Sequence, residues 1–359
     1  MDHPMHQSLT GRSLWLDYSQ RQAWEGWLAK LPPEKRDVYF LPEYARLYVS
    51  SDAEAACYVY SSGERVFLYP FLLRGVPFIP GVFDIATPYG YGGPIANTDD
   101  PDFIAEACRR FRDEASQRGV VAELIKFHPL LGNHLPLQPS YPGRIQRERS
   151  TVYAEMAVEE PRRWQEIYSH ANRKNINKAK RGGIEVRFGQ DEEAWRAFRT
   201  LYADTMADNK ADPFYLFSAD YFDRVRRDLA NHYVLVSCVL EGRTISVLLA
   251  LLGLVHAHCH LIGTDRALLN TGANNLLHHE LILWCKARGY EKLHIGGGRS
   301  GADDDPLLRF KRNFSDKTSS FFVAEHVLDE EVYADLCARW KLQHPSTEAS
   351  HHLLRYRLT

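Results

Sequence analysis

The fold is decided by residues 233–252, which read YVLVSCVL-EGR-TISVLLALL. Two apolar runs rich in Val and Leu are separated only by Glu241-Gly242-Arg243, so this stretch predicts a β-hairpin. The run Val255–Ile262 predicts a third strand. Ahead of the hairpin, Phe217–Tyr221 opens a predicted helix. This part of the chain therefore begins as a helix followed by an antiparallel meander.

Beyond the meander, the sequence predicts one more helix and one more strand. The helix covers roughly Ala273–Arg288, because Leu277, Leu281 and Trp284 lie on one stripe. The strand covers Glu291–Ile295. The second half of the chain thus reads helix, hairpin, strand, helix, strand.

The first half repeats nearly the same order, which is a weak internal repeat. Tyr39–Tyr44 opens a helix, and Ala55–Tyr60 and Arg65–Leu73 predict a hairpin. Asp102–Arg118 predicts a helix, and Val120–Phe127 a buried strand. We therefore expect an α+β protein with two similar domains, each with a mixed, mostly antiparallel sheet flanked by helices.

A Pro/Gly-rich stretch over His134–Arg144 suggests a domain boundary near Gln146–Thr151. The expected domains are residues 1–150 and residues 151–359, the second with a C-terminal helical tail. With 359 residues, 45% of them hydrophobic, the chain can bury two moderate cores. The formal net charge of −2 gives no global basic field, so any contact with a polyanion must come from a local patch.

The sequence predicts a cytoplasmic protein. It contains no apolar run long enough to span a membrane, and its start lacks the layout of a secretory signal. The six cysteines are scattered and form no C-x-x-C pair, which favours reduced thiols.

A glycine-rich segment, Thr87-Pro-Tyr-Gly-Tyr-Gly-Gly-Pro94, cannot form a regular helix or a central strand. Its glycines permit close approach of the backbone to a ligand, so Tyr89, Tyr91 and Gly92 are candidate binding residues. The alternative is a tight structural turn that packs its tyrosines on the core.

A basic segment, Arg162–Arg181, holds seven Lys or Arg residues against one acid, Glu166, for a local charge near +6. Such an imbalance could hold phosphates on tRNA or on a nucleotide-linked acceptor, with Arg173 and Lys178 as candidates. The alternative is a solvated helix face.

The segment Arg266–Asn275 leads into the second-half helix. In acetyl-CoA-dependent GNAT enzymes this place carries a glycine signature whose N–H groups hold the pyrophosphate. Here Leu269 stands where the signature requires a basic or amide residue, and Gly272 is the glycine that precedes the helix. The incomplete signature counts against an acetyl-CoA donor. Asn274 and Asn275 are candidate binding residues at the helix start.

The most informative segment, His294–Phe314, runs from a strand into Gly296-Gly297-Gly298 and an acidic loop. Asp305 can cap a short helix with Pro306 at its first position. Lys311 on that helix could stabilise negative charge on an acyl-transfer intermediate, which makes it the candidate catalytic residue. The alternative is an ordinary surface lysine. The predicted substrate-binding residues around it are Gly297, Arg299, Phe310 and Arg312.

His256, His258 and His260 alternate along one strand and therefore share a face. No acidic or cysteine residue stands at a recognisable ligand spacing, so we predict no metal site and expect His260 to line a substrate-binding cleft. No Ser-His-Asp or Cys-His set is apparent, which predicts direct transfer without an acyl-enzyme.

At these residues the chain resembles the FemABX-like (FemAB-type, BioF2-like) branch of the GNAT superfamily. The resemblance spans roughly residues 37–325. Its carrying segments are Tyr39–Tyr44, Thr87–Pro94, Phe127–Leu130, Asn172-Arg173, Lys178-Ala179, Gly296–Gly298, Phe310-Lys311 and Phe314. The helical arm that some members insert in the second domain is not evident.

The resemblance implies two GNAT-like domains with the active site in a cleft between them, and it implicates Lys311 of the Phe310-Lys311 pair in catalysis. It also implies transfer of an amino acid from aminoacyl-tRNA to an amine on a cell-wall precursor or a peptide natural product. The donor would then be a co-substrate, with no resident cofactor, and peripheral contact with a lipid-linked precursor is possible. The alternatives are an acyl-CoA-dependent N- or O-acyltransferase and a non-catalytic binding protein.

Overall fold

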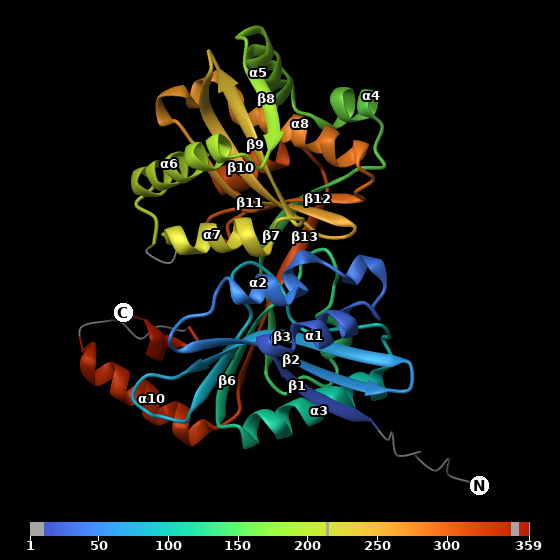
Figure 1. The fold of residues 1–359 in the computed structure, drawn as a ribbon, viewed down its shortest axis with the longest axis vertical. Coiled ribbons are helices and arrows are strands. Elements are labelled where there is room, and N and C mark those ends of the chain that lie inside the picture. Colours follow the sequence, from blue (N-terminus) through green and yellow to red (C-terminus); the bar gives the residue numbers. More distant parts are fainter. Residues whose placement is uncertain (1–10, 213–214, 346–351, 359) are drawn as a thin grey trace. The chain divides into compact units, whose positions relative to one another are not determined.

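The computed structural model describes residues 11–212, 215–345 and 352–358, which form two compact units (Figure 1). Unit 1 comprises residues 1–147 and 322–359, and unit 2 comprises residues 148–321. The boundary thus lies close to the expected position after residue 150. Residues 322–359, which we had placed in the second domain, belong instead to unit 1. The reason is long-range pairing, because the second part of strand β13 (Thr318–Val327) pairs with β6 (Val120–Lys126).

Unit 1 is built on the sheet order β1-β2-β3-β4-β6-β13, antiparallel except between β4 and β6. Its remaining strands are β1 (Arg12–Asp17), β2 (Ala53–Ser62), β3 (Arg65–Gly75), β4 (Phe83–Ala86) and β5 (Ile95–Ala96). Its helices are α1 (Arg21–Leu28), α2 (Pro42–Arg46), α3 (Pro101–Gln117) and α10 (Glu330–Gln343). The hairpin and the helix predicted for this half are confirmed.

Helices cover both faces of this sheet, and the alternation along β2 shows why. Tyr58 and Tyr60 point to one face and pack with residues of α3, including Phe103. Cys57 and Val59 point to the other face and pack with residues of α1. Because successive side chains of a strand point to opposite faces, a strand buried on both sides must be apolar throughout, as β2 is from Ala55 to Tyr60.

The C-terminal segment is fastened to unit 1 by a buried carboxylate. Asp84 on β4 is fully buried and pairs with Arg74 at 2.7 Å and with Arg357 at 2.5 Å. The Tyr356 hydroxyl donates to the same carboxylate at 3.0 Å. The Arg357 guanidinium also donates to the carbonyl of Gly75 at 2.7 Å. Residues 355–357 are therefore an integral part of unit 1.

A second buried carboxyl, Glu123 on β6, lies beneath α3. It accepts a hydrogen bond from the Tyr141 hydroxyl at 2.9 Å, and burial raises its pKa to about 7. Tyr69 and Cys108 line the same small cavity. A buried carboxyl that prefers its proton makes the free energy of unfolding depend on pH.

We expect Glu123→Gln to be more stable than the wild type at pH 8. The folded-state pKa of Glu123 lies above its unfolded value. The protonated carboxyl therefore contributes fully to the free energy of unfolding of the wild type near pH 4, and this contribution is lost as the pH rises through about 7. The amide keeps the neutral shape, so the advantage should reach at most about 3 kcal/mol at pH 8 and shrink toward pH 5. Urea unfolding at both pH values measures it, and an advantage equal at both would contradict this account.

Unit 2 has the sheet order β7-β12-β11-β10-β9-β8, with parallel pairing only between β11 and β12. Its strands are β7 (Arg144–Glu155), β8 (Glu185–Gly189), β9 (Tyr233–Leu240), β10 (Arg243–Leu252), β11 (His256–Thr264) and β12 (Lys292–Gly297). Its helices are α4 (Glu160–Arg162), α5 (His170–Arg181), α6 (Glu192–Asp208), α7 (Ala219–Asp228), α8 (Ala273–Ala287) and α9 (Pro306–Arg312). The deciding hairpin is β9 and β10, as predicted.

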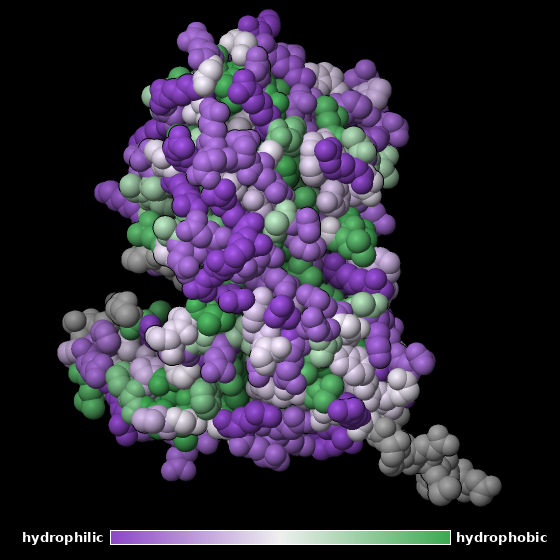
Figure 2. Space-filling view, viewed as in Figure 1, coloured by the Kyte–Doolittle hydropathy of each residue, from purple (hydrophilic) through white to green (hydrophobic). Residues whose placement is uncertain are grey.

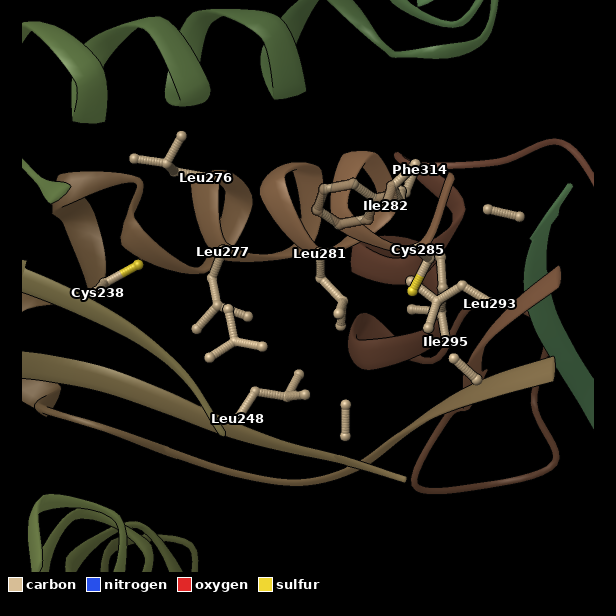
Figure 3. Packing of buried hydrophobic residues seen from close by; sticks show 14 of the residues in the cluster. Cys238, Leu248, Leu276, Leu277, Leu281, Ile282, Cys285, Leu293, Ile295 and Phe314 are labelled. Atoms are coloured by element: carbon tan, nitrogen blue, oxygen red, sulfur yellow. The ribbon is translucent and has the colours of Figure 1, made fainter. Parts of the chain in front are cut away.

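Two helical layers enclose this sheet as well. Leu277 and Leu281 of α8 point toward the strands and face Leu248 of β10 (Figure 3). On the other face, α6 lies directly against β11, since a Cβ at Gly263 would come 2.4 Å from the backbone nitrogen of Tyr202. The α+β class with mixed sheets between helices is confirmed.

The basic segment 162–181 is not one continuous helix. A π-helical turn spans Arg163–Ile167, Tyr168 is extended, and Ser169 caps a new helix, α5. The break arises because the Ser169 hydroxyl accepts from the backbone N–H of Asn172 at 3.1 Å, which starts a helix at that point.

Large exposed hydrophobic side chains are scattered, and Figure 2 shows mostly hydrophilic side chains over α6. Among the described residues, no helix is both long enough and apolar enough to cross a membrane.

Candidate active site

The short helix α9 is held in place by Asp305. Its carboxylate caps the helix by accepting from the N–H groups of Leu307 and Leu308 at 2.9 and 3.0 Å. The same carboxylate accepts from the N–H groups of Arg299 and Ser300, both at 3.0 Å. Although burial opposes ionisation, these hydrogen bonds lower the pKa of Asp305 to about 2. The predicted cap is confirmed, and it ties α9 to the loop that leaves β12.

Lys311 points back from α9 toward the end of β12. Its ammonium donates to the carbonyl of Gly297 at 2.8 Å, and its side chain is half-buried. Gly296 has φ +95°, and a Cβ there would lie 2.8 Å from Nζ. A glycine is therefore needed at residue 296 both for the backbone conformation and for the space that the ammonium occupies.

Burial lowers the pKa of Lys311 to about 8, and Asp305 offsets only part of that effect. Its other titratable neighbours are neutral at pH 7. Burial raises the pKa of the Cys259 thiol to about 12, and burial lowers the pKa of His278 to about 4. Near neutral pH the lysine is therefore mostly protonated, yet it releases its proton far more readily than an exposed lysine does.

An aromatic wall adjoins the lysine. The half-buried Phe310 ring meets His278 edge to face at 5.4 Å and Phe314 at 5.3 Å. His278 stacks on Phe314 at 5.1 Å, and its Nδ1 contacts the carbonyl of Asn274 at 2.8 Å. The predicted Phe310 thus lies in the packing that fixes α9 against α8.

Strands β11 and β12 pair in parallel only from His256 with Lys292 to His258 with His294. On its other edge β12 pairs with β7 from Lys292 to Gly297. The register between β10 and β11 shifts after Cys259, so His260 is an extra residue in the strand. Bulges of this kind commonly redirect a side chain near an active site.

His260 is half-buried and contacts the Tyr221 hydroxyl of α7 at 3.0 Å. Burial and the neighbouring His258 lower its pKa to about 3, so it is a neutral polar group at physiological pH. A neutral imidazole in this position can bind or orient a substrate but cannot supply positive charge.

Asn274 and Asn275 at the start of α8 serve the fold. The Asn274 amide oxygen accepts from Ser246 at 2.6 Å and from Thr264 at 3.1 Å. The Asn275 side chain is buried, and its amide donates to Asn172 of α5 at 2.8 Å. These contacts anchor α8 to the sheet and to α5.

The cations predicted to bind substrate have different surroundings. Arg173 donates to the carbonyls of Trp164, Gln165 and Tyr168 at 2.7–3.1 Å, so it caps the preceding turn. Lys178 is exposed and donates to the carbonyl of Asn270 at 2.5 Å.

On the loop and helix near Lys311, two further predicted cations are exposed. Arg299 donates to Asn209 at 2.9 Å, and Arg312 donates to the carbonyl of Asp303 at 3.0 Å. Their exposure leaves both guanidinium groups accessible to a ligand.

In unit 1, the predicted glycine-rich segment forms part of a tyrosine cluster. Tyr89 and Tyr91 are half-buried, and the Tyr44 hydroxyl donates to the carbonyl of Tyr89 at 2.6 Å. The Tyr91 ring meets that of Tyr39 at 5.5 Å. Gly92 is buried and its N–H donates to the carbonyl of Lys126 at 2.8 Å. The segment is thus well anchored, and a ligand-binding role for it stays a prediction, as does a cleft between the domains.

His278 and Cys259 were not among the predicted site residues. His278 follows the predicted Asn274 by one helical turn, so the sequence could have placed both on one side of α8. Cys259 neighbours the extra residue of the bulge, which no local pattern revealed.

Comparisons with known proteins agree with this architecture. Residues 169–312 match the acetyltransferase (GNAT) domain family. The structure is similar to FemX, with a TM-score of 0.70 at 12% identity, covering 90% of this chain and 99% of FemX. It is similar to L-PGS from Bacillus licheniformis, with a TM-score of 0.55 at 12% identity, covering 84% and 90% of the two chains.

A third similar structure is a tandem GNAT protein from the clavulanic acid biosynthesis pathway, with a TM-score of 0.51 at 10% identity, covering 88% and 98%. No curated protein sequence matches the chain. The chain therefore shares the fold of FemX and of the tandem GNAT protein, and its residues 169–312 match the acetyltransferase (GNAT) domain family.

Proposed function

We propose that the chain is an aminoacyltransferase that joins an aminoacyl group from aminoacyl-tRNA to an amine, such as one on a cell-wall precursor or a peptide natural product. The observation that carries the proposal is Lys311, a half-buried ammonium of lowered pKa whose titratable neighbours His278 and Cys259 are neutral. Such a cation is suited to stabilising negative charge that develops in a transition state.

The proposed chemistry is direct aminolysis. The free amine attacks the ester carbonyl of the donor and forms the C–N bond, and the C–O bond to the ribose then breaks. The Lys311 ammonium stabilises the oxyanion and donates a proton to the departing ribose oxygen, while the attacking amine loses a proton to solvent. The high pKa of Cys259 leaves little thiolate at pH 7, which supports direct attack over an acyl-enzyme.

Packing at the start of α8 supports tRNA over CoA as the source of the acyl group. Gly272 has φ +84°, and a Cβ there would lie 2.3 Å from the carbonyl oxygen of Asn175 in α5. The backbone of α5 thus lies against the turn whose N–H groups would hold the CoA pyrophosphate. Leu269 also occupies a position of the CoA signature.

The match to the acetyltransferase (GNAT) domain family favours a second candidate, an acyl-CoA-dependent N- or O-acyltransferase. Isothermal titration calorimetry with acetyl-CoA and with charged tRNA separates the two. We expect binding of charged tRNA that ribonuclease abolishes, and no saturable binding of acetyl-CoA. Tight binding of acetyl-CoA together with indifference to ribonuclease would overturn the tRNA proposal.

We expect a bell-shaped dependence of kcat/KM on pH. The rate rises as the acceptor amine loses its proton, and it falls above a pKa of about 8 as Lys311 loses its own. Lys311→Arg keeps the charge, so its descending limb should move beyond pH 10 even if its maximal rate is lower. Initial rates from pH 6 to 10 provide the test, and an unchanged descending limb in the arginine variant would show that another group titrates.

A further inference from the structure

The basic segment contains fewer available charges than its sequence suggests. Arg163 is buried, and Arg173 is engaged by backbone carbonyls. Arg162 pairs with Glu166 at 3.2 Å, and Lys180 pairs with Glu280 at 3.0 Å. These four cations are thus neutralised or enclosed.

Three cations remain along one exposed face of α5, at Lys174, Lys178 and Arg181. The Lys178 ammonium also donates to the carbonyl of Asn270, but it stays exposed. Residues at this spacing share a helix face, and the buried residues Ile176 and Ala179 lie on the opposite face. Within the described residues, no carboxylate forms an ion pair with any of the three.

The N-terminal end of α5 lies beside α9, the helix that carries Lys311. The Asn172 amide of α5 donates to the carbonyl of Asn313 at 2.8 Å, and the Ser169 hydroxyl donates to the Asn313 side chain at 2.8 Å. Asn313 directly follows α9, two residues after Lys311. From Asn172 to Arg181 the helix rises about 14 Å, comparable with a few nucleotides of a helical strand.

We infer that the face of Lys174, Lys178 and Arg181 binds the phosphate backbone of the donor's acceptor stem, so that the aminoacylated 3′ end reaches Lys311. The inference rests on the proposed function, because it assigns a surface to the RNA part of the donor. An uncompensated row of cations that leads to a catalytic ammonium suits an elongated polyanion with a reactive end.

Lys174→Gln combined with Arg181→Gln tests the surface, because neither side chain has a hydrogen bond or ion pair among the described residues. The control is Arg187→Gln combined with Arg196→Gln, in which Arg187 pairs with Glu185 at 3.0 Å. Arg196 is exposed on α6, and Arg187 alternates with Val186 and Phe188, which pack on the α5 and α8 side, so Arg187 points to the opposite face. Both double variants remove two exposed positive charges.

Fluorescence anisotropy with an acceptor-stem RNA hairpin ending in single-stranded CCA measures binding over a range of salt. We expect the α5 variant to raise Kd about 10-fold near 0.1 M salt and to reduce the slope of log K against log salt by about 1 to 2. The control variant should stay within about 2-fold of the wild type. An α5 variant that binds as tightly as the control would overturn the inference.

Two further arms distinguish RNA binding by α5 from binding of another polyanion and from a direct effect on catalysis. Vesicles containing phosphatidylglycerol serve as the second polyanion, and α5-dependent binding of vesicles with unchanged RNA binding would refute the RNA assignment. Transfer from a short aminoacyl-CCA donor, which has no stem, should be unchanged in the α5 variant. If the wild type transfers from no aminoacyl donor, the proposed function fails, whereas the hairpin measurement still decides the surface.

Discussion

Lys311→Met is expected to lower kcat/KM for amide formation by about 10²–10³-fold, the typical effect of removing one donor that stabilises a developing oxyanion. The methionine side chain has nearly the same length but carries no charge and donates no hydrogen bond. The residual rate should come from holding donor and acceptor together. Single-turnover transfer from a charged tRNA, followed by loss of the donor label, measures the effect.

Folding must be checked beside this measurement. Burial of the charged ammonium destabilises the folded state, as the lowered pKa of Lys311 indicates. Lys311→Met should therefore unfold at no lower urea concentration than the wild type at pH 7. The free energy of unfolding of the wild type should rise relative to that of the variant as the pH rises from about 8 toward 10. In this range Lys311 is already neutral in the folded state but still protonated in the unfolded state. Full turnover in a folded variant would remove Lys311 from the mechanism.

Asp84→Ala is expected to destabilise unit 1 by about 3–5 kcal/mol, the cost of leaving buried charges without their partner. The change removes the carboxylate shared by Arg74, Arg357 and Tyr356. Both guanidinium groups are mostly buried, with 22% and 18% of their side chains exposed, so water compensates only partly. Urea unfolding at pH 7 measures the loss.

Tyr356→Phe provides a graded control, since it removes one hydrogen bond to Asp84 and leaves both ion pairs. It should cost about 1 kcal/mol. Hydrogen exchange should show that residues 352–358 lose protection in Asp84→Ala before the rest of unit 1 does. Equal stability of Asp84→Ala and the wild type would contradict the role given to this carboxylate.

The elements that could be predicted from the sequence are those whose signals are local. The hairpin of β9 and β10 is marked by two apolar runs around Glu241-Gly242-Arg243, and Gly242 has φ +79°, as such a turn requires. The start of α9 is marked by Asp305 and Pro306, which form the expected cap. In both cases neighbouring residues decide the conformation.

The parts that could not be predicted depend on contacts between distant residues. Residues 322–359 join unit 1 because β13 pairs with β6 and because Arg357 meets Asp84, 273 residues away in the chain. No local pattern encodes such pairings. The sequence therefore revealed that a C-terminal tail exists but not which unit holds it.

The number of available cations in the basic segment likewise could not be predicted from the sequence. The residues of this segment sum to a charge near +6, yet Arg163 and Arg173 turn inward to backbone carbonyls. Which cations remain available depends on where the helix breaks, and the cap at Ser169 sets that break. Lys174 and Arg181 emerge as available only once their helix face is known.

We propose that this chain transfers an aminoacyl group from tRNA with the aid of Lys311. The most direct measurement incubates the purified protein and an amine acceptor, in turn, with a full set of charged tRNAs and with acyl-CoAs, and follows loss of the donor label. We predict that at least one charged tRNA is consumed, that ribonuclease stops the reaction, and that Lys311→Met slows it at least ~100-fold. Consumption of an acyl-CoA alone, or of no donor at all, would contradict the claim.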